Sequence, residues 1–347
     1  MYLGGGKMKR YVAMIVCLFM CHMNARNIWT WSYNKYFVHN QDLGKRYNRE
    51  ILFSKINIEH FSQLIFSWNA LRPKKGYFRF YVKTRNASDK KWSKWHKMID
   101  WGDKIQKTYF SKDEHSKYVY VRLEKDLDNL ADAFCVRVEK KEGVNLNLLK
   151  SMTVSISDFN KFKPEFIGNN LLSLKSICIK NVPKISQRVL DHPHTSRICS
   201  PTSCSIVASF FNKKMMNAVA FSYLVFDNSC LQAYGSWPFN TSALYSVCDQ
   251  KIFCATERMN SFSDIHKKLL LGVPVIVSVR GRLDGALKPY NGGHFMVVIG
   301  WDKKNKKVIC HDPAFYSDES TFVKYGISTF VRAWEKSRRL AYVVKRI

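Results

Sequence analysis

Short runs of alternating hydrophobic and polar residues dominate the first half of the chain. Residues 77–83 read Tyr-Phe-Arg-Phe-Tyr-Val-Lys and residues 118–123 read Tyr-Val-Tyr-Val-Arg-Leu, patterns typical of half-buried strands. Turn-rich segments such as residues 85–89 separate these runs. We therefore expect an all-β, sandwich-like region over residues 28–159. Most tryptophans of the chain also lie here, and we expect them to fill its core rather than to form a sugar-binding platform.

The second half of the chain mixes helical and strand-like patterns. The spacing of its apolar residues predicts helices after Ser200 and over residues 216–226, 241–248, 263–271 and 328–336. Apolar runs predict strands over residues 274–279, 295–300, 307–311 and 340–345. Helices dominate the first part of this half and strands follow, so we expect an α+β arrangement with a helical lobe facing an antiparallel sheet.

The N-terminus has the pattern of an export signal. A basic segment (residues 7–10) precedes an unbroken apolar run (residues 11–21), and Ala25 offers a cleavage site. This apolar run is too short to cross a bilayer, which takes about twenty residues. We expect an exported protein, whether periplasmic, cell-surface or secreted, with no transmembrane span after cleavage; an uncleaved anchor is the alternative. The predicted layout is a signal peptide (1–25), a β-sandwich-like accessory domain (26–170) and a second domain (171–347).

The composition describes a folded and strongly basic protein. A hydrophobic content of 46% and an aromatic content of 14% exclude a disordered chain. The formal net charge of +29 favours a location near an anionic polymer of the cell envelope. An excess of solvated lysines explains the charge equally well, because the lysines are scattered through both halves. No nucleic-acid-binding motif is present.

One cysteine stands where a helix is predicted to begin. Cys199 is followed by Ser-Pro-Thr-Ser and then by apolar residues with helical spacing. Ser200 is a suitable N-cap, and Pro201 fits the first helical position. A sulfur at the positive end of a helix is favoured as a thiolate, the form that acts as a nucleophile. Taken alone, Cys199 is better explained as a structural cysteine that happens to precede a helix. Cys204 is a weaker candidate for the nucleophile, about one turn into the helix.

A cysteine nucleophile needs a base, and the base needs an orienting group. The best base is His294, which follows two glycines and begins an apolar strand, and the best orienting group is Asp312 at the end of the next strand. A hairpin centred near residue 303 or 304 would place these two side chains opposite or nearly opposite each other. Gln187 is a candidate oxyanion donor together with the backbone N–H of Cys199, although a surface role is the simpler explanation for this glutamine.

Other assignments of the reactive residues are weaker. His192 and His194 lie near Cys199, but no paired cysteine motif accompanies them, so we expect no metal and no cofactor. His311 should point to the sheet face opposite Asp312. An exported protein favours disulfides, yet the cysteine spacing indicates no pairing. Cys178 and Cys310 lie in apolar runs and are expected to be buried.

Several short motifs occur in order along the second half. They are Val182-Pro183, Ser186-Gln187, Cys199-Ser200-Pro201-Thr202-Ser203, Gly235-Ser236-Trp237-Pro238-Phe239-Asn240-Thr241, Gly272-Val273-Pro274-Val275, Gly293-His294-Phe295-Met296-Val297-Val298 and Asp312-Pro313-Ala314. In this combination they resemble exported bacterial proteins of the family-thirty-nine-like group of papain-like cysteine peptidases, related to bacteriocin-processing peptidases. The resemblance covers about residues 180–345. Residues 66–70 and 92–95 look like the β-rich domain that often accompanies it.

The resemblance implies a papain-like fold with Cys199 as nucleophile, His294 as general base, Asp312 as its orienting group and Gln187 at the position of the oxyanion glutamine. Ser200 stands where glycine is commoner in the family. Leader peptides are not the expected substrate, because the sequence holds no transporter domain. The leading hypothesis is an exported thiol peptidase acting on peptides or proteins. The alternatives are a non-catalytic envelope- or cell-wall-binding protein and an amidase or thioesterase using the same residues.

Overall fold

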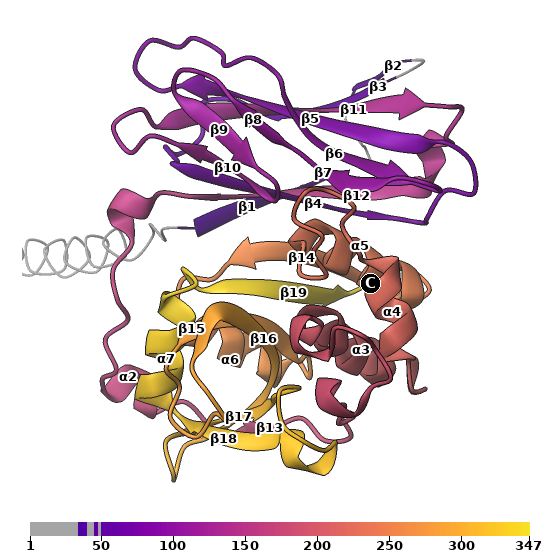
Figure 1. Ribbon diagram of the computed structural model, residues 1–347. Coiled ribbons are helices and arrows are strands. Elements are labelled where there is room, and N and C mark those ends of the chain that lie inside the picture. Colours follow the sequence, from indigo (N-terminus) through magenta and orange to yellow (C-terminus); the bar gives the residue numbers. More distant parts are fainter. Residues whose placement is uncertain (1–33, 40–44, 48–49) are drawn as a thin grey trace, which may run out of the picture. The chain divides into compact units, whose positions relative to one another are not determined.

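Three antiparallel β-sheets and a set of helices make up the described part of the molecule (Figure 1). The computed structural model describes residues 34–39, 45–47 and 50–347, and Asn34–Ile347 form one compact unit. The expected signal peptide, residues 1–25, lies outside the described residues.

Strands from the first half of the chain form two six-stranded sheets. The first has the order β1-β12-β4-β10-β9-β8, and the second has the order β2-β3-β11-β5-β6-β7. In chain order the strands are β1 (Asn34–His39), β2 (Lys45–Tyr47), β3 (Glu50–Lys55), β4 (Gln63–Ala70), β5 (Tyr77–Asn86), β6 (His96–Gly102), β7 (Gln106–Thr108), β8 (Phe110–Lys112), β9 (Ser116–Val119), β10 (Arg122–Lys125), β11 (Ala131–Lys141) and β12 (Leu149–Ser157).

The two sheets pack face to face around an aromatic core. Along β5, buried and half-buried residues alternate without interruption, as the sequence pattern predicted. Phe80 of β5 lies against Phe66 and Trp68 of β4, with ring centroids 5.2 and 4.6 Å apart. Trp101 of β6 completes this cluster at 5.5 Å from Trp68. The expected all-β sandwich is therefore confirmed.

The prediction of a strand over residues 118–123 is wrong. The segment forms the antiparallel hairpin β9–β10, in which Leu123 pairs with Tyr118 and Arg122 with Val119. Tyr120 turns the chain with a φ of 55°, in the left-handed region that residues other than glycine rarely adopt. Alternating residues cannot reveal such a turn, because Tyr118 and Leu123 remain buried on either side of it.

Only some of the tryptophans in this half pack in the core. Trp68 and Trp101 are fully or almost fully buried. Trp92 and Trp95 lie at the surface or near it, and the Lys83 ammonium stands 4.7 and 4.9 Å from their ring centroids. The expectation of core packing is thus confirmed for Trp68 and Trp101 and wrong for Trp92 and Trp95, whereas Trp29 and Trp31 lie outside the described residues.

Strands from the second half form a seven-stranded antiparallel sheet with helices around it. Its order is β14-β19-β15-β16-β17-β18, and β13 pairs with β16. The strands are β13 (Ile177–Cys178), β14 (Ile252–Arg258), β15 (Val275–Gly281), β16 (Tyr290–Asp302), β17 (Lys307–His311), β18 (Phe322–Gly326) and β19 (Leu340–Arg346). The α-helices are α2 (Asn169–Leu172), α3 (Cys199–Asn212), α4 (Ala218–Leu224), α5 (Trp237–Val247), α6 (Phe262–Leu270) and α7 (Ile327–Glu335).

Each helix and strand that the sequence predicted in this half is present; β17 has the predicted ends, and the ends of the others are shifted. The α+β class with a helical lobe before an antiparallel sheet is confirmed. Strands β14 and β18 were not predicted. In β18 only Tyr325 is fully buried, so the strand lacks the apolar alternation that reveals a half-buried strand.

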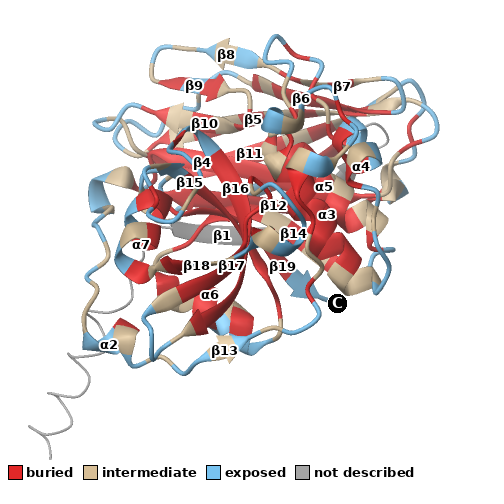
Figure 2. Cartoon of the chain, turned by 60° about the horizontal axis from the view of Figure 1, so that its bottom comes forward, coloured by how far each residue is buried: buried red, intermediate tan, exposed pale blue. Residues whose placement is uncertain are grey.

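The outer edge of β14 lies against β4 of the sandwich. Figure 2 shows β4 buried, and its polar side chains are buried as well as its apolar ones. Asn69 Oδ1 accepts a hydrogen bond from the Cys254 backbone N–H at 2.9 Å, and Ser67 Oγ accepts one from the Thr256 N–H at 3.2 Å. Side-chain oxygens of β4 therefore take the place of a neighbouring strand at this edge.

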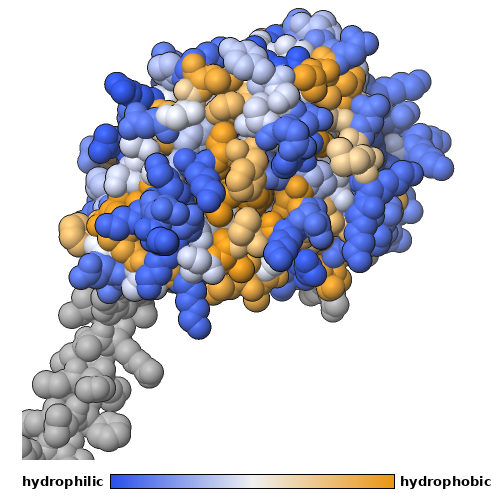
Figure 3. Space-filling model, turned by 90° about the horizontal axis from the view of Figure 1, so that it is seen from below, coloured by the Kyte–Doolittle hydropathy of each residue, from blue (hydrophilic) through white to orange (hydrophobic). Residues whose placement is uncertain are grey.

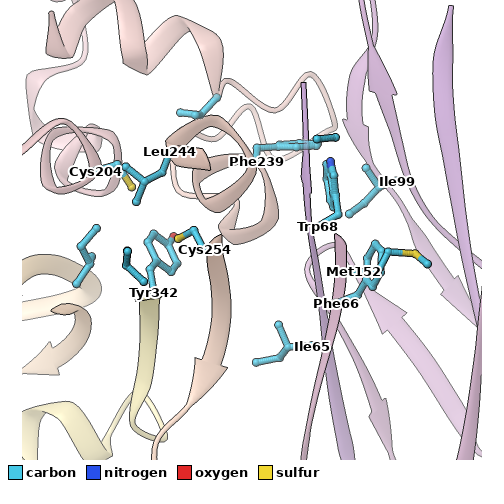
Figure 4. Close-up of a cluster of buried hydrophobic side chains, with 14 of the residues drawn as sticks. Ile65, Phe66, Trp68, Ile99, Met152, Cys204, Phe239, Leu244, Cys254 and Tyr342 are labelled. Carbon is cyan, nitrogen blue, oxygen red and sulfur yellow. The ribbon is translucent and has the colours of Figure 1, made fainter. Parts of the chain in front are cut away.

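Helix α5 joins the same core. Phe239 of α5 lies edge-on to Trp68 of β4, with ring centroids 6.1 Å apart, and Figure 4 shows the two side chains directed toward each other. Buried apolar residues of both halves thus belong to one continuous cluster. A domain boundary near residue 170 stays a prediction, because the described chain from Asn34 onward forms a single unit.

A buried aspartate fixes the loop between α4 and α5. Asp227 is fully buried and accepts hydrogen bonds from Thr108 Oγ1 of β7 and Ser236 Oγ, both at 2.6 Å. Gln106 of β7 donates to the carbonyl oxygens of Leu224 and Phe226 at 3.0 and 2.8 Å. The sandwich therefore holds the loop that leads into α5.

None of the eight cysteines in the described chain forms a disulfide. Cys310 is buried, as expected, but Cys178 is exposed, because β13 is a two-residue strand at the margin of the sheet. Hydrophobic and hydrophilic residues are interspersed on the face in Figure 3. Among the described residues, no helix combines the length and apolar character that membrane crossing requires.

Candidate active site

Cys199 is the first residue of α3. The helix begins two residues earlier than predicted, so Ile198 occupies the capping position that the sequence assigned to Ser200. Pro201 falls at the third helical position, which still needs no N–H partner within the helix. Ser200 is fully buried, and its hydroxyl lies 3.0 Å from the hydroxyl of Tyr342 on β19. The cysteine itself is half-buried at the helix N-terminus.

His294 lies on β16 and links Cys199 with Asp312. Its Nε2 is 2.7 Å from Asp312 Oδ1. Its side chain also forms a hydrogen bond with the Cys199 thiol. Because Nε2 faces the carboxylate, Nδ1 is the ring nitrogen left for the sulfur. The three side chains therefore form a continuous chain of contacts from carboxylate to imidazole to thiol.

The register that brings His294 and Asp312 together differs slightly from the prediction. Val297 pairs with His311, and the ladder shifts between Val298 and Gly300. Continuing this register places Asp312 opposite Met296, so Asp312 is a diagonal neighbour of His294 on the same sheet face. Long side chains reach across such a diagonal, which explains the contact.

Asp312 has three further donors that the sequence did not indicate. The hydroxyls of Tyr290 and Tyr325 each donate to Oδ2 at 2.7 Å, and the backbone N–H of Ala314 donates to Oδ1 at 2.9 Å. The Tyr290 ring also stacks on the His294 ring, with centroids 4.1 Å apart. Tyr290 stands four residues before His294 on the same strand, and this spacing was the one available signal for its role.

Electrostatic interactions favour the ionised forms of Cys199 and His294, a thiolate beside an imidazolium. Burial raises the pKa of the Cys199 thiol, but the charge and hydrogen bond of His294 and a backbone hydrogen bond from Phe295 lower it to below its ordinary value. Burial lowers the pKa of His294, whereas the charges and hydrogen bonds of Asp312 and Cys199 raise it to about 10. Burial raises the pKa of Asp312, but His294 and the two tyrosines hold it below its usual range.

Gln187 lies against the segment that precedes Cys199. It is buried at the start of a short 3-10 helix, η3 (Gln187–Val189), and its Nε2 donates to the carbonyl oxygen of Thr195 at 2.6 Å. Its backbone N–H donates to the Pro313 carbonyl oxygen at 2.8 Å, next to Asp312. The expected surface position for this glutamine is therefore wrong. An oxyanion role for Gln187 stays a prediction.

The rival candidates occupy other environments. Cys204 is fully buried, and burial raises the pKa of its thiol well above the ordinary value. His192 Nδ1 accepts a hydrogen bond from the His194 backbone N–H at 3.0 Å. Nowhere in the described chain do three or more metal-ligating side chains form a group that would hold a metal ion. His311 is buried, and its Nδ1 lies 2.8 Å from the Pro183 carbonyl oxygen.

Residues 179–342 match the model of the Peptidase_C39 like family. This match spans just under half of the chain. Two solved structures are similar to the chain: a putative C39-like peptidase from Bacillus anthracis and Xylellain, a cysteine protease from Xylella fastidiosa. The first is 16% identical, covers 50% of this chain and 100% of its own, and has a TM-score of 0.36. The second is 10% identical, covers 54% of this chain and 91% of its own, and has a TM-score of 0.31. The search of curated proteins gives no match.

A cleft of about 620 Å³ opens at Cys199. From the segment that matches the family Cys199, Trp237 and Gly293 line it, and from the first half of the chain Arg122 and Phe159 do so. The cleft therefore has a wall that lies outside the family match.

Proposed function

We propose that this chain is an exported thiol peptidase in which Cys199 attacks the peptide carbonyl, His294 transfers protons and Asp312 orients His294. The observation that supports it best is the continuous contact from Asp312 through His294 to Cys199 at the N-terminus of α3. Lowering the pKa of a thiol while raising that of its imidazole partner favours an activated nucleophile over a structural cysteine. A structural cysteine has no need of either shift.

The proposed reaction assigns one role each to Cys199, His294 and Gln187. The Cys199 thiolate adds to the carbonyl carbon, and the resulting oxyanion accepts hydrogen bonds from the Cys199 backbone N–H and the Gln187 side-chain amide. The His294 imidazolium then donates its proton to the leaving amine as the C–N bond breaks. Water adds to the thioester while His294 takes up its proton, and release of the acid regenerates the Cys199 thiolate and the His294 imidazolium.

Export and partners rest on the sequence alone. The signal-like residues 1–25 support export, and the net charge of +29 supports residence near an anionic envelope polymer. A peptide or protein substrate follows from the family. Amide or thioester chemistry on a non-peptide acyl donor would use the same three residues, so substrate screening distinguishes these reactions.

Alkylation mapping tests the proposed nucleophile. We expect iodoacetamide at neutral pH to modify Cys199 faster than Cys178. Cys178 is exposed, but partial burial of its sulfur raises the pKa of its thiol. In His294→Ala, labelling of Cys199 should slow by at least about tenfold, whereas labelling of Cys178 should not change. Peptide mass mapping measures both sites in the same sample. Equal rates at the two thiols, or a Cys199 rate unaffected by His294→Ala, would contradict the proposal.

A peptide-library digest tests turnover. Wild type is expected to cleave library peptides, and Cys199→Ala is expected to leave them intact. A wild-type protein that binds purified cell wall without hydrolysing any peptide, with binding retained in Cys199→Ala, would favour a non-catalytic envelope-binding protein instead.

A further inference from the structure

The cleft at Cys199 is lined by an unusual excess of positive charge. Its cationic side chains are Arg122, Arg197, Arg258, Arg280, Lys336 and Arg338. Glu124 is the one acidic residue among the lining residues. Six cations against one carboxylate leave an excess of five formal positive charges in a cleft of about 620 Å³.

The single carboxylate is already paired with its neighbour. Arg122 Nε lies 2.6 Å from Glu124 Oε1, and Lys117 Nζ, on the adjacent strand, lies 3.3 Å from Glu124 Oε2. The Arg122 guanidinium also stands 5.8 Å from the ring centroid of Trp237, the first residue of α5. Glu124 is therefore already paired with cations of the sandwich.

A buried arginine holds that opposite wall in place. Arg258 is 4% exposed; its Nε donates to Gln63 Oε1 at 2.7 Å, and its NH1 donates to the carbonyl oxygens of Ser337 and Arg338 at 2.7 and 2.8 Å. These bonds fix the turn between α7 and β19. Ser278 Oγ of β15 donates to Ser337 Oγ at 3.2 Å and ties the same turn to the sheet.

Two exposed cations of the fixed turn and a third from β15 line the cleft. Lys336 and Arg338 belong to the turn, and Arg280 lies near the end of β15 beside it. Lys336 Nζ lies close to Gly281, the residue after Arg280, since a methyl group built on that glycine would stand 3.0 Å from it. The group Arg280, Lys336 and Arg338, here called the cationic rim, thus comes from the end of β15 and from the fixed turn.

We propose that the cleft selects peptides with acidic side chains, which the cationic rim binds while Cys199 attacks a neighbouring peptide bond. This inference rests on the proposed function, because it names the substrate class of the same site. Like charges crowded in a cleft focus the field and raise the local concentration of an oppositely charged ligand. Carboxylates also match the geometry of arginine guanidinium groups. A basic peptide would meet like charges at the same place.

Binding to a turnover-deficient variant tests this directly. Fluorescent peptides with blocked termini, of equal length and rich in either glutamate or lysine, are titrated into Cys199→Ala and followed by fluorescence anisotropy. We expect the acidic peptide to bind at least about tenfold more tightly at low salt, and the difference to shrink in high salt. Equal affinities, or a preference for the basic peptide, would overturn the inference.

Paired charge reversals separate the rim from the overall charge of the protein. Arg280→Glu/Lys336→Glu reverses two rim charges, and Lys303→Glu/Lys304→Glu makes the same change at the exposed turn between β16 and β17. Both are made in the Cys199→Ala background. We expect the first pair to reduce affinity for the acidic peptide by about tenfold or more and the second to change it less than about threefold. Equal losses in both would show a general charge effect and overturn the inference.

The outcome is distinguishable from failure of the proposed function. Hydrolysis by wild type that depends on Cys199 but shows no preference for acidic peptides leaves the peptidase assignment intact and removes the acidic specificity. Selective binding of acidic peptides by Cys199→Ala without hydrolysis by wild type retains the specificity of the cleft and removes the peptidase assignment. Circular dichroism confirms that each variant is folded before it is compared.

Discussion

Asp312 accepts hydrogen bonds at both carboxylate oxygens. Oδ2 takes the hydroxyls of Tyr290 and Tyr325, while Oδ1 faces His294 and the backbone N–H of Ala314. A carboxylate has about four acceptor sites, so these four partners satisfy it. The consequence is a fully buried carboxylate that stays ionised and holds the imidazole in one orientation.

Removing the tyrosine hydroxyls should change the pH dependence of the thiol. In wild type we expect the alkylation rate of Cys199 to rise at a lower pH than the ordinary thiol pKa of about 8.5, and the His294 cation to persist up to its pKa of about 10. In Tyr290→Phe/Tyr325→Phe the pKa of Asp312 rises, its hold on the imidazolium weakens, and the rise in rate moves to higher pH. Iodoacetamide rates measured from pH 5 to pH 10 give both profiles.

A buried tyrosine elsewhere serves as the control for this shift. Tyr245 is also buried, and its hydroxyl donates to Gln250 away from the site, so Tyr245→Phe should leave the profile of Cys199 unchanged. Coincident profiles for wild type and the double tyrosine variant would mean that the two hydroxyls do not act on the thiol through Asp312.

The sequence indicated the contact between His294 and Asp312 but not the other side chains that surround them. It indicated that His294 and Asp312 would meet, and they do at 2.7 Å. Their catalytic roles, and that of Cys199, stay predictions. Tyr325 was missed because its approach to Asp312 depends on the pairing of β18 with β17, and β18 itself has no readable pattern. The cations of the cleft were missed because they come from segments far apart in the sequence.

The first turn of α3 shows how a single element is adapted to its surroundings. Ser200 does not cap the helix but uses its hydroxyl to meet the fully buried hydroxyl of Tyr342 on β19. Glycine, the residue that the sequence resemblance led us to expect at this position, has no such group. The serine is therefore explained by its tyrosine partner rather than by the helix end.

Two serines of α3 allow this explanation to be tested. Ser200→Ala leaves the Tyr342 hydroxyl without the hydrogen bond that it makes in the fold, which costs about 1–3 kcal/mol of the free energy of unfolding. Ser205 is equally buried, but its hydroxyl donates to the Pro201 carbonyl oxygen within the same helix, so Ser205→Ala should cost less. Urea denaturation measures both. In Ser200→Ala/Tyr342→Phe most of the loss should be recovered; a double variant as unstable as the single one would refute this account.

Alternation alone predicts strands but not where they turn. The segment around Tyr120 reads as one strand, yet it folds back on itself through a residue with positive φ. Helix positions were predicted well because their apolar periodicity extends over several turns, whereas their caps depend on single residues.

The contact between β4 and β14 unites the whole described molecule. Backbone N–H groups of Cys254 and Thr256 point away from β19 and donate to side chains of Asn69 and Ser67. The sequence predicted the sandwich and the peptidase half separately, and it held no sign of this contact. Polar residues in a strand usually indicate a solvated face, and here that face is buried against another sheet.

Asn69→Ala should destabilise the entire molecule. The substitution leaves the buried Cys254 N–H and the Ser151 hydroxyl without the partners that Asn69 provides, which costs about 1–3 kcal/mol per group. We expect a lower thermal midpoint with a single transition, because the two halves share one core. Asn305→Ala, at an exposed turn, serves as the control with little change. Two separate transitions in Asn69→Ala, with the midpoint of one unchanged, would show that the halves unfold independently.

The dependence of β14 on β4 also bears on how the chain is made. Synthesis proceeds from the N-terminus, so the residues of β4 leave the ribosome well before those of β14. The side-chain oxygens of Asn69 and Ser67 are therefore available when the outer edge of β14 is synthesised. A strand with bare N–H groups is a template for pairing with other chains, and this order limits the time during which newly made molecules can aggregate through it.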